Sequence, residues 1–261
     1  MIMNGTRFRR ILACAIFWIS TAMAAAEERL TVLLVQDSDF VPFMYSDNEG
    51  AAGIYTDILR AAAARLPDYD ISITASAWQR AKFLVETGRA HGLIGSYYTP
   101  SQRPWIHRYS VPFITDQITV FCREGINAAN WVYPDDYAGL RFTNNAGFAT
   151  PGDAFLKMVA ERKIDLIEEQ TTEQNLRLLE LGRADCYVQD EVTVNNVLSE
   201  QAFEKIRPVA RIRAETVHVG YSQHWTGITS GQFIEDMDAV LEAMRADGTI
   251  QAIISRATGG S

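Results

Sequence analysis

The chain has 261 residues, of which 48% are hydrophobic, and its formal net charge at pH 7 is −8. This hydrophobic content is ordinary for a globular protein, and an acidic surface repels nucleic acid, so the composition excludes a nucleic-acid-binding protein. No apolar run after residue 30 is long enough to cross a bilayer, which argues against a membrane-spanning segment in that part of the chain.

Residues 1–26 have the order of segments that is typical of a secretory signal peptide. Three arginines precede an apolar run at 11–23, and small residues follow it. The run is short for a membrane anchor, and two A-x-A patterns predict cleavage before Ala25 or Glu27. Removing the three arginines changes the net charge to about −11. The sequence therefore predicts an exported, periplasmic protein.

The first half of the remaining chain alternates strands with helices. A continuous apolar run at 30–35 predicts a buried strand, and apolar residues spaced three or four apart predict an amphipathic helix over 54–66. A second strand at 70–76 is followed by a helix that begins near Trp78 and ends at Gly88. This alternation is typical of a parallel sheet covered by helices.

The second half repeats the pattern. The strands are expected at 140–145, 164–170 and 186–190, and the helices at 153–163 and 173–182. The chain therefore predicts two α/β lobes of similar construction.

The two halves also resemble each other in sequence, since ETGRAHGLIGS in the first matches ELGRADCYVQD in the second. Aligned on their Gly-Arg-Ala triplets, Ser96 and Asp190 fall at equivalent positions, where their strands end. Ligands of open α/β sheets bind beyond the carboxyl ends of the strands. Two such lobes facing each other predict a binding site between them.

Arg103 stands between two prolines shortly after the strand that ends near Ser96. Its planar guanidinium would grip a carboxylate through two parallel hydrogen bonds, and the alternative is a surface ion pair. Asp190 would accept an ammonium group or would simply cap the helix that follows. The turn 147–151 would offer backbone N–H groups to an anion or would be a plain connection.

Two aromatic residues, Phe40 and Trp78, would stack on a ligand or belong to the core. For Cys122 and Cys186 we expect free buried thiols, with a disulfide as the alternative, because a bridge requires Cα atoms within about 7 Å. The four histidines have no spacing that is typical of a metal site, and we expect no cofactor.

With these motifs in place, the chain resembles the family 3 extracellular solute-binding proteins, the polar amino acid receptors of ABC importers. DSDFVPFMYSDNEGAAGIYTDILRAAAARL is similar to the family's opening strand and first helix, and LEAMRADGTIQAII to its C-terminal helix. In the family's central motif a carboxylate-binding arginine precedes Phe/Tyr-Ser-x-Pro by six residues, which is the spacing from Arg103 to Tyr109.

The resemblance implies roles for individual residues. Arg103 would bind a carboxylate, and Asp190, in GRADCYVQDEV, would receive the ammonium group of the ligand. The other implied ligand contacts are Ser96 and Tyr98 at the strand exit, Ala149 or Thr150 through backbone N–H groups, Phe40 and Trp78 through stacking, and Asp37 in selectivity.

The chain departs from the family pattern at three places. His91 stands where an aspartate is usual, and the TPSQR segment is one residue longer than the common TPER. Phe148-Ala149 replaces the hydroxyl residues that are frequent at the second-lobe turn. These departures affect the reach of Arg103 and the identity of the ligand.

The resemblance implies a bilobed type II periplasmic-binding-protein fold, with two mixed-sheet α/β lobes joined by a two-strand hinge. We expect lobe 1 at 28–117 and 221–261 and lobe 2 at 118–220. The implied function is capture of an amino acid or a related small carboxylate by a monomer that delivers it to an ABC permease at the inner membrane.

Two alternatives remain open. One is an enzyme similar to cyclohexadienyl dehydratase, in which Asp190 or Glu191 would act as a general acid. The other is a periplasmic sensor that presents a small acid to a membrane kinase.

Overall fold

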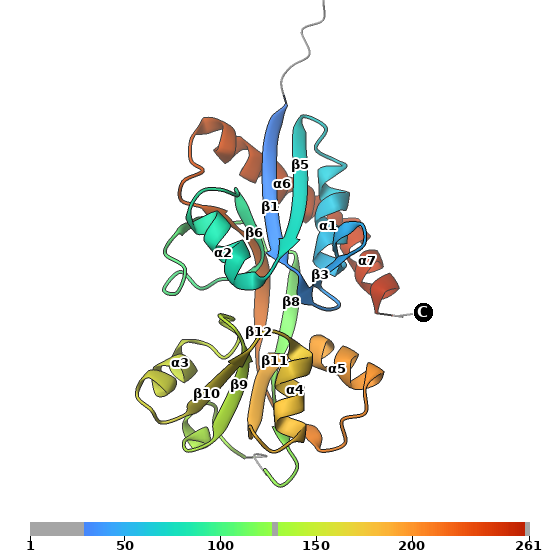
Figure 1. Cartoon of the computed structure of the whole chain (residues 1–261). Coiled ribbons are helices and arrows are strands. Elements are labelled where there is room, and N and C mark those ends of the chain that lie inside the picture. Colours follow the sequence, from blue (N-terminus) through green and yellow to red (C-terminus); the bar gives the residue numbers. More distant parts are fainter. Residues whose placement is uncertain (1–28, 127–129, 259–261) are drawn as a thin grey trace, which may run out of the picture.

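A computed structural model of the chain describes residues 29–126 and 130–258, so the predicted signal peptide lies outside the described residues. The protein has two α/β lobes, one above the other in Figure 1, and two long strands run between them. Among the described residues, no helix is both long enough and apolar enough to cross a membrane. The bilobed α/β fold expected from the sequence is confirmed.

Lobe 1 is the upper lobe in Figure 1, and its core is a sheet in which β1 pairs in parallel with β5 and with β6. Its strands are β1 (Leu30–Asp37), β5 (Tyr69–Ser76), β6 (Gly92–Tyr97) and β7 (Ile106–Tyr109), with a small separate sheet of β2 (Asp39–Phe40), β3 (Met44–Asp47) and β4 (Gly50–Ala52). Its helices are α1 (Ile54–Ala63), α2 (Trp78–Glu86), α6 (Ile228–Ala246) and α7 (Thr249–Ala257).

Lobe 2 repeats this construction with β9 between β10 and β11, all parallel. Its strands are β9 (Arg141–Asn145), β10 (Asp165–Glu169) and β11 (Cys186–Asp190), and its helices are the short 3₁₀ turn η1 (Asp135–Tyr137), α3 (Asp153–Ala160), α4 (Thr172–Glu180) and α5 (Glu191–Glu200). Thr171 and Gln174 form a capping box at the start of α4, which fixes where that helix begins.

The hinge consists of β8 (Ile114–Arg123) and β12 (Ile206–Ser222), which pair antiparallel over most of their length. β8 also pairs with β11 of lobe 2, and the end of β12 pairs with β6 of lobe 1. One continuous sheet therefore runs through both lobes in the order β10-β9-β11-β8-β12-β6-β1-β5. The lobe limits stated above, 28–117 with 221–261 and 118–220, stay a prediction.

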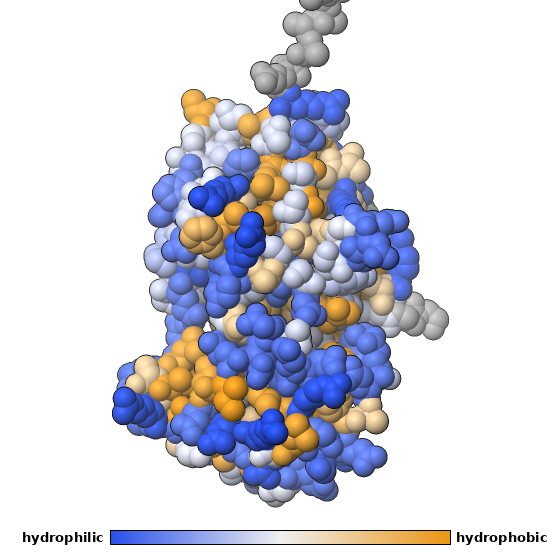
Figure 2. Space-filling view, in the orientation of Figure 1, coloured by the Kyte–Doolittle hydropathy of each residue, from blue (hydrophilic) through white to orange (hydrophobic). Residues whose placement is uncertain are grey.

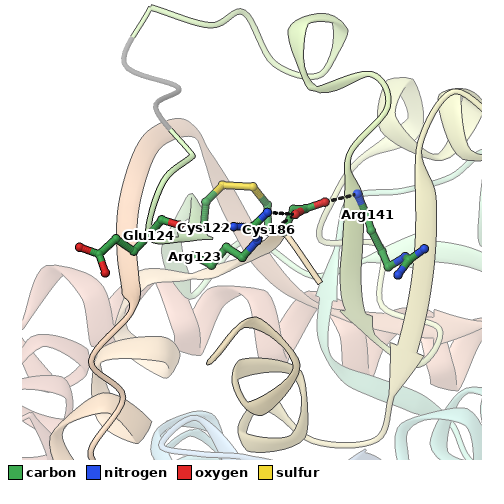
Figure 3. Close-up of a disulfide and its surroundings, with 6 residues drawn as sticks. Cys122, Arg123, Glu124, Arg141 and Cys186 are labelled. Carbon is green, nitrogen blue, oxygen red and sulfur yellow. Dashed lines mark hydrogen bonds and ion pairs between the residues drawn. A yellow bond between two sulfur atoms is a disulfide. The ribbon is translucent and has the colours of Figure 1, made fainter. Parts of the chain in front are cut away.

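The expectation of free thiols is wrong, because Cys122 and Cys186 form a disulfide. They face each other in the antiparallel register of β8 and β11, with a Cα–Cα distance of 4.0 Å. Beside the bridge, Arg123, labelled in Figure 3, forms an ion pair with Asp185, whose carboxylate also accepts the backbone N–H of Arg141. The bridge thus ties the hinge strand to the core of lobe 2.

Candidate functional site

A small cavity lies between the lobes, near the ends of β6 and β8. Its volume is about 20 Å³, which is the space of roughly one water molecule. It is lined from lobe 1 and the hinge by Phe40, Met44, Tyr55, Trp78, Gly95, Tyr97, Arg103 and Asp116, and from lobe 2 by Phe148, Ala149 and Thr150. On the face drawn in Figure 2 the two lobes touch across the middle of the molecule. Around Arg103 the cleft is closed in this structure.

Arg103 is the basic residue of this cavity, and its side chain is 5% exposed. The loop after β6 holds it through a backbone hydrogen bond to Thr99, and its Nη1 donates to Ser96 Oγ at 2.7 Å. Its Cζ lies 5.2 Å from the centre of the Trp78 ring. Within the described part of the chain no carboxylate pairs with it. Burial lowers the pKa of Arg103 to about 10, so the side chain remains a cation that lacks a counter-ion.

Three aromatic rings meet across the cleft. The Phe148 ring, from lobe 2, lies 5.5 Å from the Phe40 ring and 5.3 Å from the Trp78 ring. The preceding carbonyl, of Gly147, accepts hydrogen bonds from Trp78 Nε1 at 3.2 Å and Lys82 Nζ at 2.9 Å. Gly147 has φ +72°, and a Cβ there would overlap the side chains that reach it from α2. The second-lobe turn is therefore held directly against α2.

Asp116, on the hinge strand β8, is a cavity residue that the sequence prediction missed. It is 2% exposed, and both carboxyl oxygens accept hydrogen bonds, from the Tyr55 hydroxyl at 3.0 and 2.9 Å and from the Tyr97 hydroxyl at 2.8 Å. Burial, together with the charge of Asp190, raises the pKa of Asp116 well above its ordinary value. A signal was present in the sequence, since Asp116 lies midway between Ile114 and Ile118, at the position in an alternating segment where an apolar residue would be expected.

Asp190 ends β11 and caps α5, because its Oδ1 accepts the backbone N–H of Thr193 at 2.9 Å. It is 1% exposed, and no group among the described residues is hydrogen-bonded to its Oδ2. Burial raises its pKa to about 6. It does not line the cavity of Arg103; with Asp116 it borders a separate groove of about 550 Å³ beside α7. Arg103 and Asp190 therefore border two neighbouring spaces that share Asp116.

The fold agrees with comparisons to known proteins. Residues 32–260 match the profile of the bacterial extracellular solute-binding proteins, family 3. The chain belongs to this family.

Among its relatives are the virulence sensor proteins BvgS of Bordetella bronchiseptica and Bordetella parapertussis, each 24% identical over 221 residues. The match covers 85% of this chain and 17% of the length of each BvgS protein.

Solved structures share the fold. A histidine kinase sensor domain with similarity to periplasmic binding proteins has a TM-score of 0.73 at 22% identity, and covers 88% of this chain and 96% of its own. A mutant of ArgBP from T. maritima has a TM-score of 0.70 at 17% identity, and the match covers 87% of this chain and 94% of the ArgBP chain. At these identities the likeness shows the fold alone.

The remaining predicted site residues of this family 3 solute-binding protein fall into two groups. Phe40, Trp78, Ala149 and Thr150 line the cavity, and Ser96 lies behind it, fully buried and bonded to Arg103. Phe40 and Trp78 also belong to the hydrophobic core, so a role in packing is compatible with a role in stacking on a ligand.

Two residues lie outside the cavity lining. Tyr98 is 62% exposed and borders a larger groove of about 730 Å³ beside β12. Asp37 ends β1 and is buried. Its side chain accepts hydrogen bonds from the backbone N–H groups of Ser38 and Asp39. Burial raises the pKa of Asp37 to about 6.

Glu191, the other candidate acid of the enzyme alternative, is already paired. Its two oxygens accept from Nε and Nη2 of Arg211, each at 2.7 Å. The arginine holds the pKa of Glu191 below its ordinary value, which keeps the carboxyl ionised at neutral pH. An ionised, paired carboxylate is unsuited to donate a proton.

Proposed function

We propose that this family 3 protein works in the periplasm, where it captures a small carboxylate, an amino acid or a related acid, between its lobes and delivers it to an ABC importer. The observation that carries the proposal is Arg103, a buried guanidinium for which the described residues supply no counter-ion. A buried charge without a partner is costly in folding, and a bound carboxylate would supply that partner through two parallel hydrogen bonds.

The other groups of the cleft suit the same anion. The hydroxyl of Ser96 already contacts Arg103 Nη1, and Ala149 and Thr150 line the same cavity from lobe 2. A ligand held between these groups would contact both lobes at once. Contacts that exist only when the lobes are together favour the closed form over the open one.

Entry of a solute requires the cleft to open, because about 20 Å³ is far below the volume of a small-molecule site. The hinge strands β8 and β12 are the connections that would bend. Closure around the solute would then present a distinct surface to the permease. The permease would thereby distinguish the loaded protein from the empty one.

The sensor function is a second candidate, and the BvgS and histidine kinase relatives favour it. In that case the closed, loaded form would be presented to a membrane kinase. Both candidates share the binding step. They differ in whether deletion of the gene abolishes uptake of the solute or a transcriptional response to it.

We propose binding without catalysis. Of the two acids considered for a dehydratase, Glu191 is paired with Arg211, and Asp190 caps α5 away from the cavity. Incubation of the protein with prephenate or arogenate should leave these compounds unchanged, and release of an aromatic product would contradict the proposal.

A thermal-shift screen against amino acids and small carboxylates tests the binding step. A ligand present at 100 times its dissociation constant stabilises the native state by about 2.7 kcal/mol, which gives a clear rise in melting temperature. We expect at least one carboxylate to raise it. A set of positively charged or neutral solutes serves as the control, and shifts confined to that set would contradict a site built around Arg103.

A further inference from the structure

We propose that the cleft selects aromatic carboxylates that carry no ammonium group next to the carboxylate. This inference rests on the proposed function, because it assumes that Arg103 binds an anion, and it narrows the class of solute. Two features carry it: the ring slot that Phe148 fills, and the hydrogen bonds that occupy Asp116.

The ring slot is formed by lobe 1 and filled by lobe 2. Phe40 and Trp78 present their rings to the Phe148 ring at 5.5 and 5.3 Å, which is the range of favourable aromatic pairs. Arg103 lies against the same Trp78 ring, at 5.2 Å. A slot that accepts a phenyl ring from the protein's own turn has the shape to accept one from a ligand. A solute with a ring and a carboxylate would replace Phe148 between the rings and reach Arg103.

The wall of the cavity gives an ammonium group no carboxylate among the described side chains that is not already hydrogen-bonded. Asp116 is the carboxyl that lines it, and the hydroxyls of Tyr55 and Tyr97 already donate to both of its oxygens. Burial also raises the pKa of Asp116 well above its ordinary value, which weakens its ability to hold a cation. Asp190, the expected acceptor, does not line this cavity; it borders the neighbouring groove beside α7, which shares Asp116 with the cavity.

The nearby charges also disfavour an ammonium. Lys82 and Arg103 border the same small groove on the side of α2, and Lys82 Nζ lies 2.9 Å from the Gly147 carbonyl. Two cations beside the slot repel a third and attract an anion. Glu86 borders the same groove as Lys82, so the positive charge that the ammonium group of an α-amino acid would meet without a counter-ion among the described residues is that of Arg103.

Matched pairs of ligands test the inference by calorimetric titration of the wild-type protein. Benzoate, phenylacetate and 3-phenylpropanoate vary the distance from ring to carboxylate. L-Phenylalanine differs from 3-phenylpropanoate only by the ammonium group, phenylglycine differs in the same way from phenylacetate, and propanoate and acetate lack the ring. We expect the best aromatic acid to bind at least about tenfold more tightly than the matching amino acid and the matching ring-free acid. The ammonium group of the amino acid lacks a partner in the cavity, and the ring-free acid leaves Phe40 and Trp78 without a ring to contact.

The outcomes separate the inference from the proposed function. If an amino acid or a ring-free acid binds as tightly as its aromatic counterpart, or if no aromatic acid binds while another carboxylate does, the inference is overturned and carboxylate binding stands. If no carboxylate of any kind binds, both are overturned. Loss of aromatic-acid binding in Arg103→Met, with the melting temperature retained, is the expected control result.

Discussion

Replacing Phe148 by alanine should open the cleft in the absence of any solute. Phe148 is the ring that lobe 2 contributes to the slot, and it makes two aromatic contacts with lobe 1, to Phe40 and Trp78. Each such pair is worth about 0.5–1.5 kcal/mol, so the variant should lose about 1–3 kcal/mol of closure free energy. This loss corresponds to a fall of about 5- to 150-fold in the ratio of closed to open molecules.

Single-molecule energy transfer between the lobes would measure this shift. Cysteines introduced at Leu181 in lobe 2 and Ile228 in lobe 1, both strongly exposed, would carry the dyes. Labelling would be selective because Cys122 and Cys186 are paired with each other. Val132→Ala, at an exposed apolar position of lobe 2, is the matched control.

We expect high transfer efficiency in the wild type and in the control, and a new low-efficiency population in Phe148→Ala. An aromatic acid that fills the slot should restore the closed population of the variant. Identical transfer distributions for wild type and Phe148→Ala would refute the reasoning that this ring holds the lobes together.

Two further predictions concern stability. The disulfide closes a loop with a sequence separation of 64, so removing it in the Cys122→Ala/Cys186→Ala variant should lower the free energy of unfolding by about 4 kcal/mol; an unchanged urea midpoint would contradict this. Burial raises the pKa of Asp37 from 3.8 to about 6, so the folded state holds this proton more tightly than the unfolded state, and stability is lost as pH rises through about 6. Asp37→Asn removes this loss while keeping an acceptor for Ser38 and Asp39. Relative to wild type, the unfolding free energy of Asp37→Asn should rise by up to about 3 kcal/mol between about pH 4 and pH 8. A stability difference between the two proteins that does not grow with pH would contradict the raised pKa of Asp37.

The sequence predicts those features that depend on local pattern. The apolar spacing of Ile54, Ile58 and Leu59 gave the buried face of α1, and all three residues are at most 1% exposed. The repeated Gly-Arg-Ala segments gave two equivalent strands, β6 and β11, each paired in parallel on one side and antiparallel to a hinge strand on the other. The region of the cleft follows from this repeat, because both strands end there.

Other features depend on which segments become neighbours, and a single sequence does not reveal that. The disulfide follows from the register of β8 against β11, which pairs residues 64 positions apart. The role of Asp116 is visible only in the fold, where Tyr55 of α1 and Tyr97 of β6 donate hydrogen bonds to its carboxyl group. The sequence shows Phe148 as a departure from the family pattern, but its contacts with Phe40 and Trp78 depend on how the lobes close.

The most direct test of the central claim is a calorimetric titration of wild type and Arg103→Met with the carboxylate that gives the largest thermal shift. Methionine keeps much of the side-chain volume and removes the buried, unpaired charge, so the variant should fold with unchanged or greater stability. We predict measurable binding by the wild type and none by the variant. Near-normal affinity in a folded Arg103→Met protein would contradict the claim that this cleft binds a carboxylate through Arg103.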